Sequence, residues 1–173
     1  PASTTKLMTA VVALENGNLT DTVTVSQSAL DGLPERGSSV FLIAGEEMSF
    51  SDMLNYLLVA SGNDAANALA EHVAGSVDNF VAMMNEKAAE LGCTGTHFAN
   101  PHGLHDENHY TTARDLLYIA RYAMQNPTIT EIVAKPQIEL APTNKHAEST
   151  TLTTTNHLLT RIRRSEYYYP SAI

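Results

Sequence analysis

The chain is poor in positive charge, in cysteine and in long apolar runs, and each shortage excludes a class of protein. Only ten of its 173 residues are Lys or Arg, against 19 Asp or Glu, so its net charge is −9. Binding to nucleic acid depends on clustered positive charge. The one basic cluster, Arg161, Arg163 and Arg164, is short and typical of solvated surface. We therefore expect no nucleic-acid partner.

The single cysteine, Cys93, excludes an internal disulfide and a zinc site built from cysteines. No apolar run approaches the roughly 18 residues of a membrane span, and there is no recognisable signal peptide, although a mature chain would look the same. Membrane association would therefore come only from segments outside this sequence. With 43% hydrophobic and 17% charged residues and no low-complexity tract, residues 1–173 are expected to form one globular domain.

Apolar residues at helical spacing predict that most of the chain is helical, in a two-lobed unit with little sheet of its own. The expected helices span 6–16, 51–60, 63–73, 76–92, 111–125 and 127–133, with caps at Ser51, Asn63, Ser76 and Thr111 or Thr112, and ends at Gly17 and Gly75. Short strands are expected at 22–25 and near Val40–Ile43, before a turn at Ala44 and Gly45. Residues 135–155 are expected to form two short strands or an extended loop, and 167–173 (YYYPSAI) to begin a strand.

The first helix raises a question of charge, because Lys6 lies at the edge of its apolar stripe. At about 100° per residue, Ser3 is aligned with Leu7, Ala10 and Leu14, and Lys6 lies only about 60° from Ser3. Residues three apart on a helix can share a hydrogen bond. A serine hydroxyl needs a neighbouring base, and a lysine is a base only when neutral, a state that burial and a helix N-terminus both favour. Ser3 and Lys6 are therefore candidates for a nucleophile and its base. The alternative for this motif alone is a surface lysine whose stem packs past Leu7.

A second polar pair, Ser61 and Asn63, lies between two predicted helices. Ser61 continues the spacing of Leu54 and Leu57, so its hydroxyl is expected to point where their apolar face points. Gly62 breaks the helix, and Asn63 can cap the next one, which is an ordinary structural role. Capping does not explain a hydroxyl on a buried stripe. Both side chains can project into one cleft.

Together, Ser3-Thr-Thr-Lys6 and Ser61-Gly-Asn63 resemble two motifs of the penicillin-recognising serine acyltransferases, whose signatures are Ser-x-x-Lys, Ser-Asp-Asn and Lys-Thr-Gly. Within this class the chain is similar to the low-molecular-mass D-alanyl-D-alanine carboxypeptidases, penicillin-binding proteins of the S11 peptidase type. The resemblance covers nearly the whole chain, through PASTTKLMTA, SGNDAANALAEHVAG, NEKAAELG, THFANPHGL and HYTTARDLLYIA. Ser-Gly-Asn in place of Ser-Asp-Asn, without a recognisable deacylating glutamate loop, favours a carboxypeptidase over a β-lactamase.

The resemblance implies an α/β fold of the serine β-lactamase and penicillin-binding transpeptidase type, of which 1–173 would be a mainly helical, partial catalytic domain. It also implies roles. Ser3 would attack the carbonyl between two D-alanines of a peptidoglycan stem peptide, and Lys6 would take its proton. Ser61 would relay a proton to the leaving amine, and Asn63 would bind the substrate's amide backbone. Water would then hydrolyse the acyl-enzyme and release the shortened peptide, whereas a β-lactam would remain attached to Ser3. No cofactor is implied, and the expected location is the outer face of the cytoplasmic membrane in the bacterial cell envelope.

The family's third motif, Lys-Thr-Gly, does not occur in the sequence. In the family it follows a stretch like YYYPSAI, so we expect the chain to be truncated before that strand and also to lack the strands that precede Ser-x-x-Lys. The missing strand would complete the oxyanion hole, so the isolated chain is expected to be inactive or nearly so. Its uncovered apolar surface would favour self-association or pairing with the missing strands. The alternative is a catalytically incomplete module that binds cell-wall peptides or β-lactams.

A cluster of possible metal ligands lies in NPHGLHDENHY. It comprises His102, His105, Asp106, Glu107 and His109. The spacing matches no closed helical or finger pattern, and such clusters in loops are usually solvated. We therefore expect no metal here. A metalloenzyme would lose activity to a chelator, and a serine enzyme would not.

Overall fold

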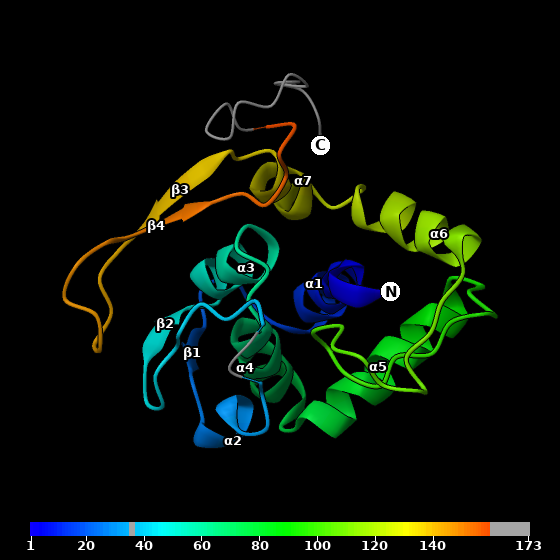
Figure 1. Ribbon diagram of the computed structural model, residues 1–173, viewed down its shortest axis with the longest axis horizontal. Helices are drawn as coiled ribbons and strands as arrows, with labels where there is room; N and C mark the ends of the chain where they lie inside the picture. Colours follow the sequence, from blue (N-terminus) through cyan, green and yellow to red (C-terminus); the bar gives the residue numbers. More distant parts are fainter. Residues whose placement is uncertain (35–36, 160–173) are drawn as a thin grey trace.

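The computed structural model describes residues 1–34 and 37–159, and it is built around one helix (Figure 1). The central helix is α1 (Thr5–Asn16), preceded by a short 3-10 helix, η1 (Ala2–Thr4). Four helices contact α1, namely α3 (Phe50–Leu58), α4 (Asn63–Ala74), α5 (Val77–Glu90) and α6 (Ala113–Ala123). Two shorter helices, α2 (Gln27–Leu30) and α7 (Pro127–Val133), lie at the periphery. The mainly helical character predicted from the sequence is confirmed.

α1 is buried on almost every side, so the single apolar stripe predicted for it is wrong. Met8 and Val12, outside that stripe, are 0% and 1% exposed, whereas Leu7 and Leu14, within it, are only half-buried. The reason is that helices pack against several faces of α1 at once. A polar residue on such a helix is also buried, and it must then find a hydrogen-bond partner.

Helix boundaries follow the predicted caps in most places. The side chains of Ser76 and Thr112 each accept the backbone N–H of the third residue of the helix that follows, and Gly75 ends α4 in a left-handed conformation. Two predicted caps are wrong. α3 is capped by Ser49 instead of Ser51, and α4 begins at Asn63 after Gly62, so the Asn63 side chain is not a cap.

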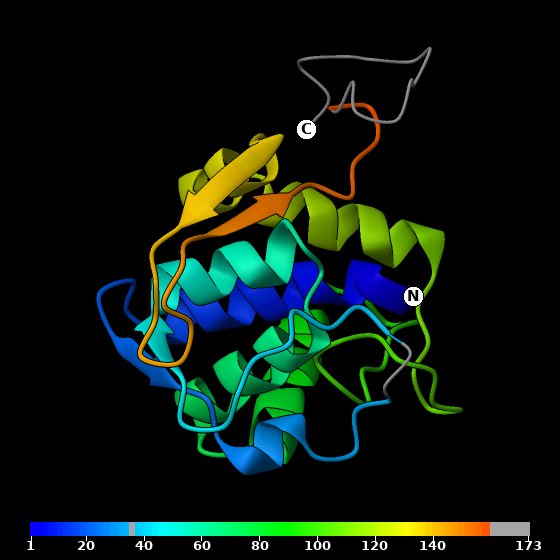
Figure 2. The ribbon, with the colours of Figure 1, turned by 60° about the vertical axis from the view of Figure 1, so that its left-hand side comes forward.

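The strands form two separate antiparallel pairs. β1 (Thr22–Thr24) pairs with β2 (Glu47–Ser49), and β3 (Gln137–Leu140) pairs with β4 (Thr150–Thr153). The predictions for 22–25 and for two strands within 135–155 are confirmed. Figure 2 shows the β3–β4 hairpin lying over α3. Segment 167–173 and the arginines at 161, 163 and 164 lie outside the described residues.

The strand predicted at Val40–Ile43 is wrong, and the turn at Ala44 and Gly45 is correct. The backbone N–H groups of Val40 and Leu42 donate to the Asp64 carboxylate instead of to a neighbouring strand. A buried side chain on α4 therefore replaces the ladder that would have made this segment a strand. Among the described residues, no helix combines the length and apolarity needed to cross a bilayer.

The turn after this loop is joined to the tip of the β3–β4 hairpin by Glu46, whose side chain is 0% exposed. One carboxylate oxygen accepts from Thr143 Oγ1 at 2.7 Å and from His146 Nδ1 at 2.8 Å. The other accepts from the Ile43 N–H at 3.0 Å. Glu46 must be the acceptor in all three of these hydrogen bonds, and a carboxylate can accept on both of its oxygens.

Glu46→Gln should therefore lower the free energy of unfolding by about 1–3 kcal/mol, because the amide directs N–H groups at a buried donor. Urea denaturation monitored by circular dichroism measures the change. The matched control is Glu139→Gln, an exposed glutamate that accepts one hydrogen bond from Ser149. Equal effects of the two substitutions would contradict the account.

Candidate active site

The amine of Lys6 is the point at which three segments of the chain meet. Lys6 lies in the first turn of α1 and is 2% exposed. Its Nζ lies 2.7 Å from Asn63 Oδ1 on α4, 2.7 Å from the His102 carbonyl oxygen in the α5–α6 loop, and 3.3 Å from Ser3 Oγ in η1. The hydrogen-bond distance expected between Ser3 and Lys6 is present, and the structure adds a contact between Lys6 and Asn63.

The surroundings of Lys6 make its neutral form more accessible than that of an exposed lysine. Burial lowers the pKa of Lys6 to about 8, and the nearby Asp64 carboxylate, which raises it, does not offset this. A neutral amine has two N–H groups and one lone pair. Asn63 Oδ1 and the His102 carbonyl oxygen can only accept, so they take the two N–H groups. The lone pair is then left for the hydroxyl of Ser3.

Ser3 is exposed, and its position depends on a close approach between two backbone segments. Gly103 has φ +87° and packs against the carbonyl of Ala2, where a Cβ at position 103 would overlap the Ala2 oxygen. Ala2 itself has φ +52°, an uncommon conformation for a residue other than glycine. The glycine thus allows the α5–α6 loop to lie directly on the residue before Ser3.

Ser61 occupies a different position from the one its spacing predicts. α3 ends at Leu58, so Ser61 does not continue the apolar face of that helix. It lies in the connection to α4, half-buried, with φ +60°. Across the described part of the chain, no hydrogen bond joins the Ser61 hydroxyl to Lys6 or Asn63. Helical extrapolation failed because the turn starts before Gly62.

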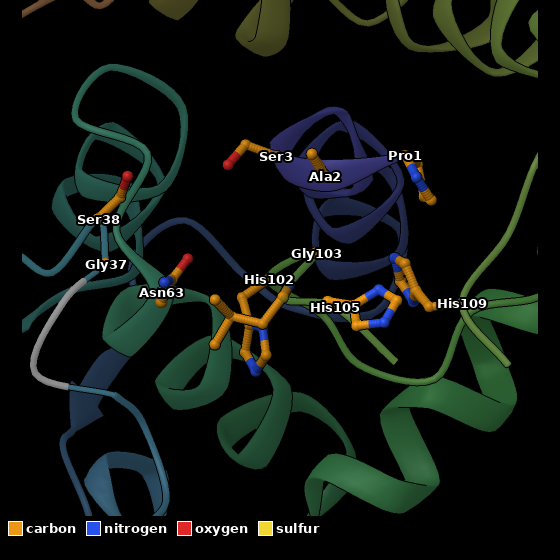
Figure 3. Close-up of a pocket in the computed structure, with 11 residues that line it drawn as sticks. Pro1, Ala2, Ser3, Gly37, Ser38, Asn63, His102, Gly103, His105 and His109 are labelled. Atoms are coloured by element: carbon orange, nitrogen blue, oxygen red, sulfur yellow. The ribbon is translucent and has the colours of Figure 1, made fainter. Parts of the chain in front are cut away.

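The cluster opens onto a cleft of about 430 Å³ (Figure 3). Its walls are formed by Pro1, Ala2, Ser3, Gly37, Ser38, Asn63, His102, Gly103, Leu104, His105 and His109. In Figure 3, the side-chain oxygens of Ser3 and Asn63 point into the space between the two residues. The volume lies in the usual range for a small-molecule site. Sequence reasoning missed the contribution of residues 37–38 and of the His102 backbone, because no motif defines their distance along the chain from Ser3.

Loop 37–43, which supplies one wall, is organised by Asp64. This carboxylate is 2% exposed and accepts from the hydroxyl of Ser39 at 2.7 Å as well as from two backbone N–H groups of the loop. The N–H of Asn63 donates to the Ser38 carbonyl at 2.7 Å. The start of α4 therefore holds both the cleft wall and the amide that contacts Lys6.

Two histidines of the possible metal-ligand cluster, His102 and His109, have hydrogen-bond partners within the loop. Burial lowers the pKa of both His102 and His109 to about 4, so both are neutral near pH 7. His102 Nδ1 accepts from the Leu104 N–H at 3.1 Å, and His109 Nδ1 accepts from the Ala99 N–H at 2.9 Å. Within residues 1–34 and 37–159, no group of three or more His, Cys, Asp or Glu is placed to hold a metal ion.

Proteins with this fold have been solved. The S216A mutant of the Streptomyces K15 DD-transpeptidase superposes with a TM-score of 0.84 at 34% identity, covering 94% of this chain and 67% of that one. A D-alanyl-D-alanine carboxypeptidase from Mycobacterium tuberculosis gives 0.82 at 36% identity, covering 94% and 60%. The fold is therefore that of the penicillin-binding DD-transpeptidases, as predicted.

The family is equally clear from sequence. Residues 1–165 match the model of the S11 peptidases, described as D-alanyl-D-alanine carboxypeptidase. DacF of Bacillus subtilis is 43% identical over 136 residues, covering 76% of this chain and 34% of DacF. DacB2 of Mycobacterium tuberculosis is 41% identical over 138 residues, covering 79% and 46%. The chain belongs to the D-alanyl-D-alanine carboxypeptidase family, and it spans between about a third and a half of these curated relatives.

Gly103→Ala should disrupt the contact between the α5–α6 loop and η1. The matched control is Gly92→Ala, because Gly92 has φ +74° but no atom within 4 Å of the added Cβ. Both substitutions carry the cost of a left-handed backbone, of order 1 kcal/mol, and only Gly103→Ala adds the overlap with Ala2. Urea denaturation should therefore show a clearly larger loss of stability for Gly103→Ala. A loss no greater than that of Gly92→Ala would contradict the described packing.

Proposed function

We propose that the protein is a serine-type D-alanyl-D-alanine carboxypeptidase that trims the terminal D-alanine from peptidoglycan stem peptides in the cell envelope. Ser3 is the nucleophile, Lys6 its base, Ser61 a proton relay and Asn63 a substrate-binding residue. The observation that carries the proposal is the pair of neutral acceptors on Lys6, which directs the lone pair of the neutral amine at Ser3.

Acylation begins with transfer of the Ser3 proton to Lys6 Nζ as Oγ attacks the carbonyl carbon between the two D-alanines. The resulting ammonium keeps its bonds to Asn63 Oδ1 and the His102 carbonyl, and its third N–H faces the reacting oxygen. The proton then passes through the Ser61 hydroxyl to the leaving amine, a step that requires Ser61 to move within hydrogen-bond distance of Lys6, because no bond joins them in the described residues. Water hydrolyses the ester and restores Ser3. This mechanism uses no cofactor.

Asn63 divides its amide between two tasks. Its Oδ1 accepts from Lys6, which leaves Nδ2 to donate to a carbonyl of the substrate backbone in the cleft. A β-lactam presents a comparable amide carbonyl and would acylate Ser3 in the same way. Because its leaving group stays attached, it would remain as an adduct.

Residues 1–173 are, in this proposal, the helical part of one catalytic domain that acts on the outer face of the cytoplasmic membrane. The Lys-Thr-Gly strand would come from outside this sequence, to bind the substrate carboxylate and complete the oxyanion hole. The proposal is supported by the coverage of the solved relatives, of which this chain matches 60–67%.

A second candidate function is a binding module, which would apply if no Lys-Thr-Gly strand completed the site. A protein with an incomplete oxyanion hole would bind cell-wall peptides or β-lactams without turning them over. The two functions differ in whether a covalent bond to Ser3 forms.

Intact mass after incubation with a penicillin distinguishes them. We expect one adduct per molecule when the chain is extended by the segment of a family member that contains the Lys-Thr-Gly strand. The Ser3→Ala control should give none. The chain alone should react far more slowly or not at all. Reversible binding without an adduct in the joined protein would refute the carboxypeptidase and favour the binding module.

The rate of acylation should also follow the protonation of Lys6. Because the pKa of Lys6 is lowered to about 8, the neutral fraction rises about tenfold per pH unit below pH 8 and levels above it. We expect the acylation rate constant to have the same profile between pH 6 and 10. His102 and His109, whose pKa values are lowered to about 4, do not titrate in this range. A profile that is flat, or one that rises only near pH 10, would exclude Lys6 as the base.

A further inference from the structure

The segment 97–110 is a closed loop between α5 and α6. At its neck, His97 and Tyr110 exchange two backbone hydrogen bonds of 2.9 and 3.0 Å. Just inside the neck, His109 Nδ1 accepts from the Ala99 N–H at 2.9 Å. Two layers of hydrogen bonds therefore close the loop, and the inner one depends on an imidazole.

This loop covers one face of the N-terminal end of η1 and α1. Thr9 Oγ1 donates to the Pro101 carbonyl at 2.6 Å, and Lys6 Nζ donates to the next carbonyl, that of His102. His109 Nε2 lies 2.7 Å from the hydroxyl of Thr5, which is the first residue of α1 and lies one turn before Thr9. Of these contacts, only the one between Thr5 and His109 joins two side chains.

The hydrogen-bond pattern fixes the tautomer of His109. Because Nδ1 accepts from a backbone N–H, the ring proton is on Nε2 and donates to the Thr5 hydroxyl. Thr5 is 0% exposed and His109 is 9% exposed, with the ring of Phe98 packed at 5.7 Å between centroids. Thr5 has no exposed surface through which water could replace this partner, so losing the bond to His109 leaves its buried hydroxyl unpaired.

We propose that His109 is a positioning residue. By joining Thr5 on α1 to Ala99 at the loop neck, it holds the His102 carbonyl on Lys6 Nζ and keeps the lone pair of the neutral amine directed at Ser3. The proposal rests on the proposed function, in which Lys6 is the base. A reacting group displaced by about 1 Å can cost about a hundredfold in rate, so a loosened loop should slow acylation.

The two bonds of His109 can be removed separately. His109→Asn retains an acceptor near Nδ1 but loses the donor to Thr5, and Thr5→Val removes the same bond from the other side without changing side-chain size. Thr5→Ser keeps the hydroxyl and is the conservative variant. The matched control is His97→Asn, which makes the same substitution at the neck in an exposed histidine that does not contact α1.

The first readout is acylation by a penicillin, measured in the protein joined to a Lys-Thr-Gly segment. The kinetics give two quantities, the affinity of the initial complex and the rate constant of bond formation. We expect His109→Asn and Thr5→Val to lower the rate constant 10- to 100-fold with at most threefold change in affinity. Thr5→Ser and His97→Asn should remain within threefold of the parent in both. Loss of affinity alone, or equal rates for Thr5→Val and Thr5→Ser, would overturn the proposal.

NMR titration of the Lys6 Cε resonance gives a second readout that does not require activity. Burial is the main cause of the lowered pKa of Lys6. A loosened loop in Thr5→Val would admit water beside Lys6, which should raise that pKa toward its ordinary value. The other groups beside the amine, Asp64 and His102, are the same in this variant. An unchanged pKa of Lys6 would overturn the positioning role. If the parent protein is not acylated at all, the proposed function fails, and this titration still decides how His109 acts on Lys6.

Discussion

The burial of one amine at the N-terminal end of α1 is the constraint on which the rest of the site depends. An ammonium withdrawn from water is costly unless it is neutralised or surrounded by acceptors. η1, the start of α4 and the α5–α6 loop converge on Lys6, and each supplies one oxygen to it. Helices pack around α1, and the Lys6 side chain is 2% exposed. Packing around α1 thus determines the chemistry at its end.

The choice of acceptors decides the charge of Lys6. A carboxylate in direct contact would hold the ammonium, whereas an amide oxygen and a carbonyl oxygen satisfy its N–H groups without fixing the charge. Among residues 1–34 and 37–159, the carboxylate that acts on the pKa of Lys6 is that of Asp64, and its oxygens accept hydrogen bonds from loop 37–43. Desolvation therefore outweighs Coulombic attraction, and the pKa of Lys6 falls to about 8. The same aspartate builds a wall of the cleft without acting as the partner of the lysine.

Features that depend on neighbours in sequence were predictable. The caps at Ser76 and Thr112 and the proximity of Ser3 to Lys6 follow from spacing within one turn, and the motifs indicated the family. Features that depend on tertiary contacts were not. The loop at Val40–Ile43 has strand-like residues but bonds to a side chain on α4, and Ser61 lies beyond a helix end that periodicity does not reveal. Contacts made through a backbone carbonyl, such as that of His102, are independent of side-chain identity and so have no sequence signal.

The central claim is that burial leaves Lys6 able to act as a base near neutral pH. Its most direct test is the pKa of Lys6 itself, obtained by NMR titration of the protein labelled with carbon-13 at lysine, with Lys6→Arg to assign the resonance. The account predicts a single transition near pH 8, well below those of the other lysines. A transition at about 10.4 or above, the ordinary range for an exposed lysine, would contradict it.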